Sequence, residues 1–226
     1  MTTVLITGAN KGIGFETARQ LTALGHTVWI GARDAQRGQA AAVTIGAKWV
    51  QLDVTDDESI AAAMATIAAA GGLDVLVNNA GVPPHAPFGD DWFDVFNTNT
   101  LGVVRVTQAA LPLLRQSSNP GVVNLASSLG SFGVVTNPAK MQSTFASGIY
   151  GTSKAAVSML TLQYSMAEPT VKFNAVEPGY TNTDFNAAML GGRSVTESAR
   201  GVVERVLLPV GGPTGTLVEN GEPIPW

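Results

Sequence analysis

The chain has 226 residues, of which 45% are hydrophobic and 13% charged, with a net charge of −4 and a sequence pI near 5.1. This composition is typical of a globular α/β domain and excludes a largely disordered chain. The acidic balance argues against nucleic acid as a main partner, because phosphate binding depends on lysine and arginine. No cysteine is present, which excludes disulfides and thiolate metal sites, and we expect a single domain over residues 1–226.

Neither the N-terminus nor the longest apolar run resembles a targeting or membrane segment. Residues 2–7 enter a strand pattern without a basic n-region or a cleavage-site signature. The alanine-rich run at 60–70 is 11 residues long, whereas a helix that spans a bilayer needs about 20. We therefore expect a cytoplasmic protein that does not bind or cross membranes.

Short apolar runs alternate with longer helical patterns, which indicates βα units and a parallel sheet. The expected strands are residues 4–6, 27–31, 47–52, 73–77, 122–125, 171–176 and 215–218. The main expected helices are residues 15–24, 55–70, 91–116, 149–167 and 196–208. Right-handed crossovers then predict an α/β fold. It is a doubly wound Rossmann domain whose mostly parallel sheet has about seven strands and helices on both faces. Its ligand crevice is expected at the carboxyl ends of the strands.

Local signals mark the ends and breaks of these helices. Gly25 is expected to cap the C-terminus of the first helix. Thr55 and Glu58 have the spacing of a capping box at the start of the helix that follows the third strand. The pattern at 91–116 is expected to be interrupted by the poor helix formers of residues 97–100, by Gly102 and by Pro112.

A glycine-rich turn joins the first expected strand to the first helix. In Gly8-x-x-x-Gly12-x-Gly14, the first glycine permits a tight turn and the second lets the backbone approach a phosphate. The third glycine allows the helix to pack close to the strand, and the helix N-terminus favours an anion. A glycine triplet alone could be a plain turn, but its place at the start of a βαβ pattern favours a dinucleotide site.

Tyr150 and Lys154 are four residues apart in a helical pattern, so their side chains share one face. Such a pair can arise by chance. The functional alternative is that the Lys154 ammonium stabilises the phenolate form of Tyr150. We therefore expect Lys154 to lower the pKa of Tyr150 toward neutral pH, where it can exchange a proton. Ser127 follows the expected strand 122–125, where a hydroxyl can stabilise charge on a substrate oxygen, and Ser128 competes for this role.

Polar residues follow two other expected strands at the same edge. Asp53 follows strand 47–52, where its carboxylate could accept a hydrogen bond from an adenine amino group or lie on the surface beside a helix. Residues 78–81, Asn-Asn-Ala-Gly, could let the backbone lie against a ligand or form an ordinary turn. No group of histidines or carboxylates has metal-ligand spacing, so no metal site is expected.

Residues 7–14, residues 78–81 and the Tyr150–Lys154 pair together resemble the short-chain dehydrogenase/reductase family, in the family's order and over essentially the whole chain. Residues 31–41 and the loop 10–14 are most similar to carbonyl-reductase-like members. The resemblance implies an oxidoreductase that transfers a hydride between a nicotinamide cofactor and a small-molecule carbonyl or alcohol substrate.

The resemblance also assigns roles to individual residues. The spacing Asn124-x-x-Ser127-x-x-Gly130 favours Ser127 as the serine that polarises the substrate oxygen. A break at Asn99 would let an ordered water link its backbone to Lys154, although a poor helix former at a kink also explains Asn99. The expected catalytic residues are Asn99, Ser127, Tyr150 and Lys154. The expected cofactor-binding residues are Gly8, Asn10, Lys11, Gly12, Ile13, Gly14, Arg33, Asp53, Val54, Asn79, Ala80, Gly81, Tyr150, Lys154, Pro178, Gly179, Thr181 and Thr183.

The end of the second expected strand distinguishes NADP from NAD. An acidic residue there bonds the ribose 2′-hydroxyl of NAD, whereas a cation accommodates the 2′-phosphate of NADP. In the family register this position is Ala32, followed by Arg33, and Lys11 adds a second cation. Asp34 is the alternative ribose ligand, but we interpret it as the cap of the following helix. We therefore expect NADP(H).

Residues 131–147 lengthen the interval between Ser127 and Tyr150 compared with most members of the family. Their apolar side chains predict a cover over the substrate mouth that blocks a helix-packed interface, while a short satellite helix is the alternative. Trp226 is expected to dock on the protein.

The leading function is an NADP(H)-dependent carbonyl reductase. The alternatives are an NAD(H)-dependent alcohol dehydrogenase and a catalytically silent NADP sensor, and monomer and homo-oligomer both stay open.

Overall fold

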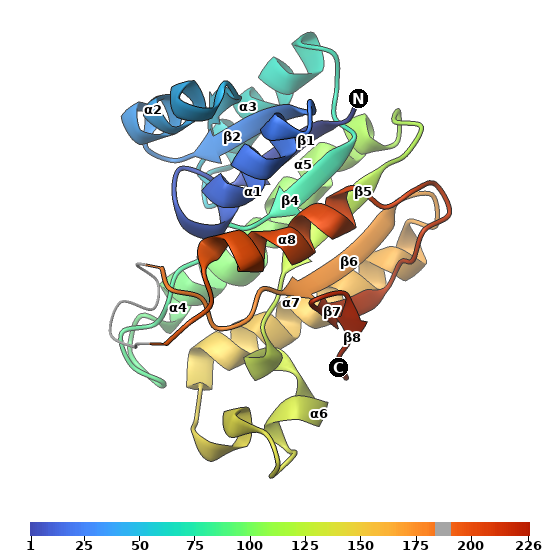
Figure 1. Cartoon of the computed structure of the whole chain (residues 1–226). Helices are drawn as coiled ribbons and strands as arrows, with labels where there is room; N and C mark the ends of the chain where they lie inside the picture. Colours follow the sequence, from blue (N-terminus) through green and yellow to red (C-terminus); the bar gives the residue numbers. More distant parts are fainter. Residues whose placement is uncertain (184–190) are drawn as a thin grey trace.

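An eight-stranded sheet forms the centre of the structure, a computed structural model that describes residues 1–183 and 191–226 (Figure 1). The strand order is β3-β2-β1-β4-β5-β6-β7-β8, and all neighbours pair in parallel except β7 and β8. The strands are β1 (Thr3–Thr7), β2 (Thr27–Ala32), β3 (Lys48–Gln51), β4 (Val75–Asn78), β5 (Gly121–Leu125), β6 (Lys172–Glu177), β7 (Thr216–Glu219) and β8 (Glu222–Pro223). The expected doubly wound α/β fold is confirmed.

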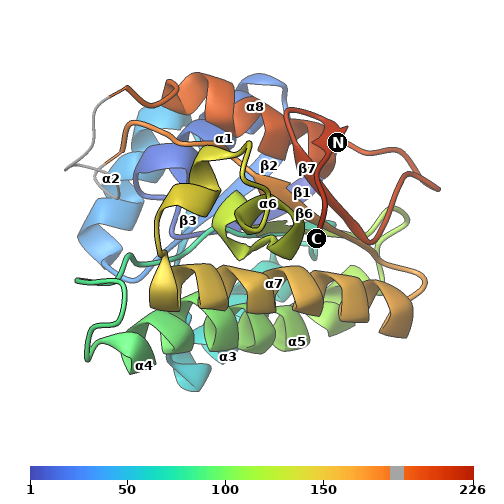
Figure 2. The same ribbon diagram turned by 90° about the horizontal axis from the view of Figure 1, so that it is seen from below.

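Helices cover both faces of this sheet (Figure 2). One layer contains α1 (Gly12–Ala23), α2 (Ala35–Ile45) and α8 (Val195–Val206). The other contains α3 (Asp57–Ala69), α5 (Gly102–Leu114) and α7 (Gly148–Ala167). Within residues 1–183 and 191–226, no helix combines the length and the apolar character that crossing a membrane requires.

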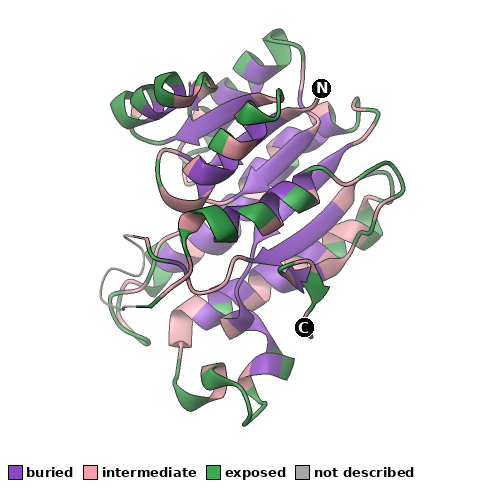
Figure 3. Ribbon diagram, viewed as in Figure 1, coloured by how far each residue is buried: buried purple, intermediate pink, exposed green. Residues whose placement is uncertain are grey.

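The central strands are buried on both faces, which explains their nearly continuous apolar sequences (Figure 3). Along β1, Val4 and Ile6 pack into the core beneath α1, α2 and α8, while Leu5 packs into the core on the other face. Each fully buried side chain of this size contributes about 1.5–3 kcal/mol relative to an exposed one. The two cores hold the strand ends, and therefore the loops after them, in fixed positions.

The start of α3 differs from the expected capping box. Asp56 caps this helix, since its side chain accepts hydrogen bonds from the backbone N–H groups of Glu58 and Ser59 at 2.9 and 3.2 Å. Thr55 is held outside the helix because the Asp53 carboxylate accepts bonds from both its N–H and its hydroxyl, at 2.9 and 2.7 Å. The capping-box assignment to Thr55 was therefore wrong by one residue.

The expected break in the long helical pattern is confirmed as a π-helix, η1 (Asn97–Leu101), between α4 (Trp92–Phe96) and α5. In this turn the Gly102 N–H donates to the Asn97 carbonyl five residues earlier. The expected interruptions at Gly102 and Pro112 were wrong, because α5 begins at Gly102 and continues through Pro112 to Leu114.

Residues 131–147 form a short helix, α6 (Phe132–Val135), and a 3₁₀ turn, η3 (Met141–Thr144). The C-terminal residues pack against this segment, since the Gly133 N–H donates to the Trp226 carbonyl at 2.9 Å. The Ser131 hydroxyl donates to the Pro225 carbonyl at 2.6 Å. The chain at Trp226 is thus docked through its backbone, as expected, while the Trp226 side chain is 37% exposed. The β8 strand before it was not expected and brings the sheet to eight strands.

Candidate active site

A crevice of about 1280 Å³ runs along the carboxyl ends of the strands, where the strand order reverses between β1 and β4. Its lining includes residues from the loops after β1, β2, β3, β4, β5 and β6, together with residues of α7. The expected site residues that lie outside this lining are Gly14 and Asn99. The topology therefore brings the other expected residues to one continuous site.

The loop after β1 fits a pyrophosphate. Gly8 and Gly12 have φ angles of 64° and 60°, which residues other than glycine rarely adopt. A Cβ on Gly8 would lie 2.9 Å from the Ala80 backbone, whereas a Cβ on Gly12 would have its nearest contact at 3.6 Å, with Thr183. The backbone at Gly12 thus borders open space in the crevice, and α1 begins there with its N-terminal amides.

The loop after β4 is fastened to this glycine loop. The Asn79 side chain donates to the carbonyls of Thr7 and Gly8 at 2.7 and 3.2 Å. The Thr7 hydroxyl accepts the N–H groups of Asn79 and Ala80, both at 3.0 Å. Gly14 leaves room for this contact, because a Cβ there would lie 2.9 Å from Asn79 Cγ. Gly14 therefore lets the loop after β4 pack against the glycine loop, and it does not itself line the crevice.

Cationic side chains gather at the β2 end of the crevice. Ala32 is buried at the end of β2, and the exposed Arg33 lines the crevice together with Lys11 and Arg37. Asp34 caps α2, since its carboxylate accepts the Arg37 N–H at 2.9 Å and lies 3.6 Å from the Arg37 guanidinium. The cap interpretation of Asp34 is confirmed, and its carboxylate is engaged by its own helix.

Three polar side chains meet where β5 and α7 face the crevice. Ser127 follows β5, and its hydroxyl is hydrogen-bonded to Tyr150. Lys154 lies one turn further along α7, 5.8 Å from the centre of the Tyr150 ring, and donates to the Leu125 carbonyl at 2.7 Å. The Ser128 hydroxyl instead accepts a bond from Gln142 at 3.1 Å. Ser127 is thus the serine that pairs with the phenol.

Asn99 contributes its side chain to the architecture of the site. The side chain is buried, with 1% exposure. Its amide oxygen accepts the Val82 N–H at 2.8 Å, and its amide nitrogen donates to the Val82 carbonyl at 3.0 Å. A third contact reaches the Ser153 hydroxyl at 3.3 Å. The side chain therefore fixes the loop after β4 to the π-helix and to α7, a contact that the sequence did not predict.

Comparisons with known proteins identify the family. The sequence model described as short chain dehydrogenase matches residues 2–192. The chain belongs to the short-chain dehydrogenase/reductase family. It is therefore an oxidoreductase that uses a nicotinamide cofactor.

Individual relatives agree with this placement. Short-chain dehydrogenase anuI of Penicillium roqueforti (strain FM164) is 34% identical, covering 88% of this chain and 86% of that protein. The (−)-isopiperitenone reductase of Mentha piperita is 31% identical, covering 93% and 94%. Among solved structures, NADPH-bound carbonyl reductase from chicken fatty liver has a TM-score of 0.87 and 29% identity, covering 100% of this chain and 99% of that one.

Burial governs the two titratable groups of this short-chain dehydrogenase/reductase site. It raises the pKa of Tyr150 above its ordinary value, the negative charge of Glu177 raises it further, and the bond with Ser127 opposes the rise. Burial lowers the pKa of Lys154 to about 8, while Glu177 acts to raise it. The expectation that Lys154 brings the Tyr150 pKa down toward neutrality was wrong for the free protein, because desolvation is the larger effect.

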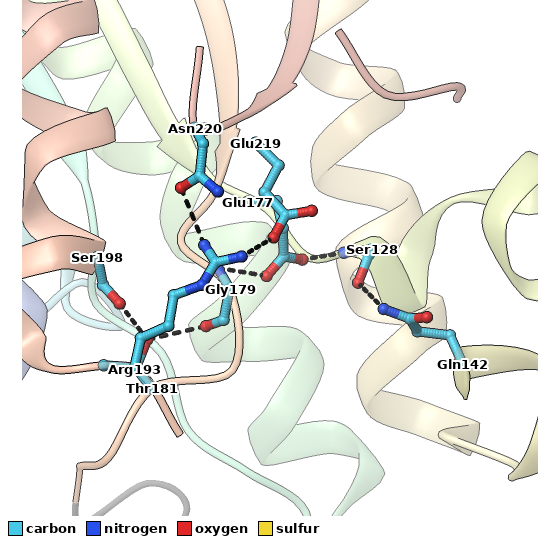
Figure 4. A network of polar contacts seen from close by, with 9 residues as sticks. All are labelled: Ser128, Gln142, Glu177, Gly179, Thr181, Arg193, Ser198, Glu219 and Asn220. Carbon is cyan, nitrogen blue, oxygen red and sulfur yellow. Dashed lines mark hydrogen bonds and ion pairs between the residues drawn. The ribbon is translucent and has the colours of Figure 1, made fainter. Parts of the chain in front are cut away.

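Glu177, the last residue of β6, is a site residue that the sequence reasoning missed (Figure 4). It lines the crevice, is 6% exposed and accepts hydrogen bonds from the N–H groups of Ser128 and Gly179. Burial raises its pKa, and these two bonds oppose the rise. The available signal was a carboxylate directly after the expected strand 171–176, at the crevice end of the sheet, since buried carboxylates are rare without partners.

The segment 131–147 reaches the same crevice, as expected for a cover over the mouth. Met141, Gln142 and Phe145 are part of the lining. The segment also contains the short helix α6, so both interpretations of its sequence describe part of it. On the opposite side, the Arg193 guanidinium lies against Gly179 and pairs with Glu219 and Asn220 (Figure 4).

Proposed function

We propose that the protein is an NADP(H)-dependent reductase that converts an aldehyde or ketone to an alcohol, with Tyr150 as the proton donor. The observation that carries this proposal is the contact between Tyr150 and Ser127 in a crevice that also contains a glycine cradle and Lys154. The name of one structural relative, a carbonyl reductase, supports carbonyl substrates.

The residues of the crevice fit a dinucleotide phosphate. The N-terminus of α1 and the loop from Gly8 to Ile13 would hold the pyrophosphate, and Arg33 with Lys11 would hold the 2′-phosphate. Asp53 and Val54 would border the adenine, and Asn79, Ala80 and Gly81 the adjoining ribose. Pro178, Gly179 and Thr181 would enclose the nicotinamide end, and Thr183, beside Gly12, would lie near a phosphate. The bound cofactor supplies the hydride.

The side chains around Tyr150 then divide the remaining work. The hydroxyls of Ser127 and Tyr150 are adjacent, so one carbonyl oxygen can accept hydrogen bonds from both as negative charge develops on it. Tyr150 gives its proton to that oxygen. Lys154 holds the ribose and stabilises the phenolate that is left, and the backbone of Asn99 joins Lys154 through water to restore the proton.

The deciding experiment follows the absorbance of NADPH in the presence of aldehydes, ketones and quinones, with NADH in parallel. We expect substrate-dependent loss of NADPH and a clear preference for NADPH over NADH. Tight NADPH binding without turnover on any carbonyl would instead favour a nucleotide sensor. Faster turnover with NADH would overturn the cofactor assignment and point back to Asp34.

A further inference from the structure

Glu177 is a buried carboxylate in the crevice that the proposed chemistry does not use. It ends β6 directly opposite Glu219 of β7, so two carboxylates are neighbours across the strands. Burying an ionised carboxylate is costly unless hydrogen bonds and opposite charges compensate, and a like charge nearby increases that cost. The hydrogen bonds and charges around Glu177 therefore indicate which role in the site compensates for the cost of burying it.

The two oxygens of Glu177 join two loops of the site (Figure 4). Oε2 accepts the N–H of Ser128, in the loop after β5, and Oε1 accepts the N–H of Gly179 at 2.7 Å, in the loop after β6. Ser128 is covalently joined to Ser127, whose hydroxyl contacts Tyr150. The position of the Ser127 hydroxyl therefore depends on a link that Glu177 makes between the loops.

The charge of Glu177 acts on both titratable groups of α7. Glu177 lines the crevice together with Tyr150 and Lys154, and the Lys154 ammonium bonds the carbonyl of Leu125, whose register partner on β6 is Val176, the residue before Glu177. At this position the negative charge of Glu177 raises the pKa of both Tyr150 and Lys154, and the charge of Glu219 on β7 raises the pKa of Glu177. Arg193 partly neutralises Glu219 through their ion pair. Since an ammonium is stabilised and a phenolate is destabilised by a nearby carboxylate, Glu177 favours the protonated form of both Lys154 and Tyr150.

We propose that Glu177 is a positioning residue of the active site, which fixes the loop that carries Ser127 and keeps Lys154 in its ammonium form. The part that concerns Ser127 and Tyr150 rests on the proposed function. The protonation of Lys154 does not, because it can be measured without turnover.

The test compares Glu177→Gln, which removes the charge, with Glu177→Asp, which keeps the charge on a shorter side chain. Asp74→Asn is the matched control. Asp74 is also a partly buried carboxylate that accepts a backbone N–H, from Thr3 at 2.7 Å, but it lies before β4 at the opposite edge of the sheet. Circular dichroism establishes that each variant folds.

The first readout is carbon-13 NMR of the free protein labelled at lysine Cε. The chain has five lysines, and Lys154→Met assigns the resonance of Lys154. We expect Glu177→Gln to lower the pH at which Lys154 titrates by about one unit, the low end of the effect of a close opposite charge. Glu177→Asp and Asp74→Asn should leave that pH nearly unchanged. Equal titration of Lys154 in Glu177→Gln and the control would overturn the charge role.

The second readout is the pH profile of carbonyl reduction. In Glu177→Gln the alkaline decline of kcat/KM should move to lower pH, because both proton-bearing groups lose protons sooner. In Glu177→Asp the decline should stay in place while kcat falls at least tenfold, because the shorter side chain cannot reach both Ser128 and Gly179. A kcat of Glu177→Asp equal to that of the control would overturn the positioning role. A wild type without reductase activity would refute the proposed function, while the NMR result on Lys154 would still stand.

Discussion

Tyr150 and Lys154 are both buried, and burial favours the neutral form of each, a phenol and an amine. A phenol that retains its proton is suited to donate it, whereas alcohol oxidation would need a phenolate to accept one. The neutral phenol of the free protein is thus in keeping with the reductive direction proposed above. Cofactor and substrate have to supply the interactions that let the phenolate form.

Replacing Tyr150 by Phe should lower turnover by at least about 100-fold and leave NADPH affinity within about threefold of wild type, because the proton donor is lost and the ring is kept. Initial rates and fluorescence titration with NADPH measure the two effects. Tyr164→Phe is the control on the same helix, since the Tyr164 hydroxyl accepts a bond from Gln108 at 2.8 Å, outside the crevice lining. A Tyr150→Phe protein with more than a tenth of wild-type turnover would remove Tyr150 from the mechanism.

The low pKa of Lys154 predicts a pH-dependent affinity for NADPH. Its ammonium is present below about pH 8 in the free protein and is lost as the pH rises through that value. A ribose contact that needs the ammonium should therefore weaken above pH 8, with the dissociation constant rising up to about tenfold per pH unit. Titrations with NADPH between pH 6 and pH 10 measure this. Lys154→Met should bind NADPH weakly at every pH. Lys172→Met is the control, because Lys172 begins β6, at the end of the strand away from the crevice, and this variant should keep the wild-type profile. A flat wild-type profile would contradict the ribose role.

At the scale of elements, long periodic patterns were predictable and short tertiary contacts were not. The helix expected at 149–167 is α7, because its signal is repeated over several turns. The strand β8 has two residues, one of them Pro223, and exists through its pairing with β7, which local sequence does not record. Thr55 and Asp56 are both acceptable caps for α3. The Asp53 carboxylate decides between them because it accepts bonds from the N–H and the hydroxyl of Thr55, a local pairing that the residue types alone do not specify.

The candidate site was predictable to the extent that it follows strand ends. Loops after parallel strands meet at one edge, so Ser127 and the glycine loop could be assigned to the crevice from their place in the sequence. The side-chain contacts of Asn99 and Glu177 depend on neighbours 17 and 49 residues away, Val82 and Ser128. No local pattern encodes such pairs, and the resemblance to the family concerned the backbone of Asn99 alone.

The segment 131–147 gives a prediction at this scale. Ser131 is fully buried, and its hydroxyl joins the Val134 N–H at 3.0 Å to the Pro225 carbonyl at 2.6 Å. Ser131→Ala should cost about 1–3 kcal/mol, because the buried Val134 N–H and the partly buried Pro225 carbonyl lose their partner. It should also raise KM for the carbonyl more than it lowers kcat, because the segment lines the mouth. Urea unfolding, steady-state kinetics and hydrogen exchange of 131–147 measure these effects.

Ser143→Ala is the control within the same segment, since the Ser143 hydroxyl bonds the Lys140 carbonyl three residues away at 2.8 Å. We expect its stability to stay within about 0.5 kcal/mol of wild type, as for most surface substitutions. Equal stability and equal KM for the two variants would mean that the C-terminal residues do not support the mouth.

Over the whole molecule, the charge is unevenly placed relative to the crevice. The chain is acidic, with a net charge of −4, yet Lys11, Arg33 and Arg37 gather at the β2 end. The carboxylates in the same part of the lining have partners of their own: Glu16 pairs with Arg19, Asp34 with Arg37, and Asp53 binds Thr55. The carboxylates Glu177 and Glu219 lie at the β6–β7 end. An extended ligand with its most negative group at one end would therefore bind in one orientation, with that group toward β2.

This polarity predicts how Arg33→Ala changes stabilisation by the two cofactors. A charge-assisted contact with the 2′-phosphate contributes about 1.5–3 kcal/mol, so NADPH affinity should fall about 10- to 150-fold, while NADH affinity should hardly change. Because a ligand at 100 times its dissociation constant stabilises the folded protein by about 2.7 kcal/mol, the loss is measurable as a smaller rise in melting temperature with NADPH. Arg115→Ala, which removes a guanidinium bound to Glu168 outside the crevice lining, should leave both cofactors unaffected. If Arg33→Ala weakened NADH as much as NADPH, Arg33 would support the loop after β2 and would not read the phosphate.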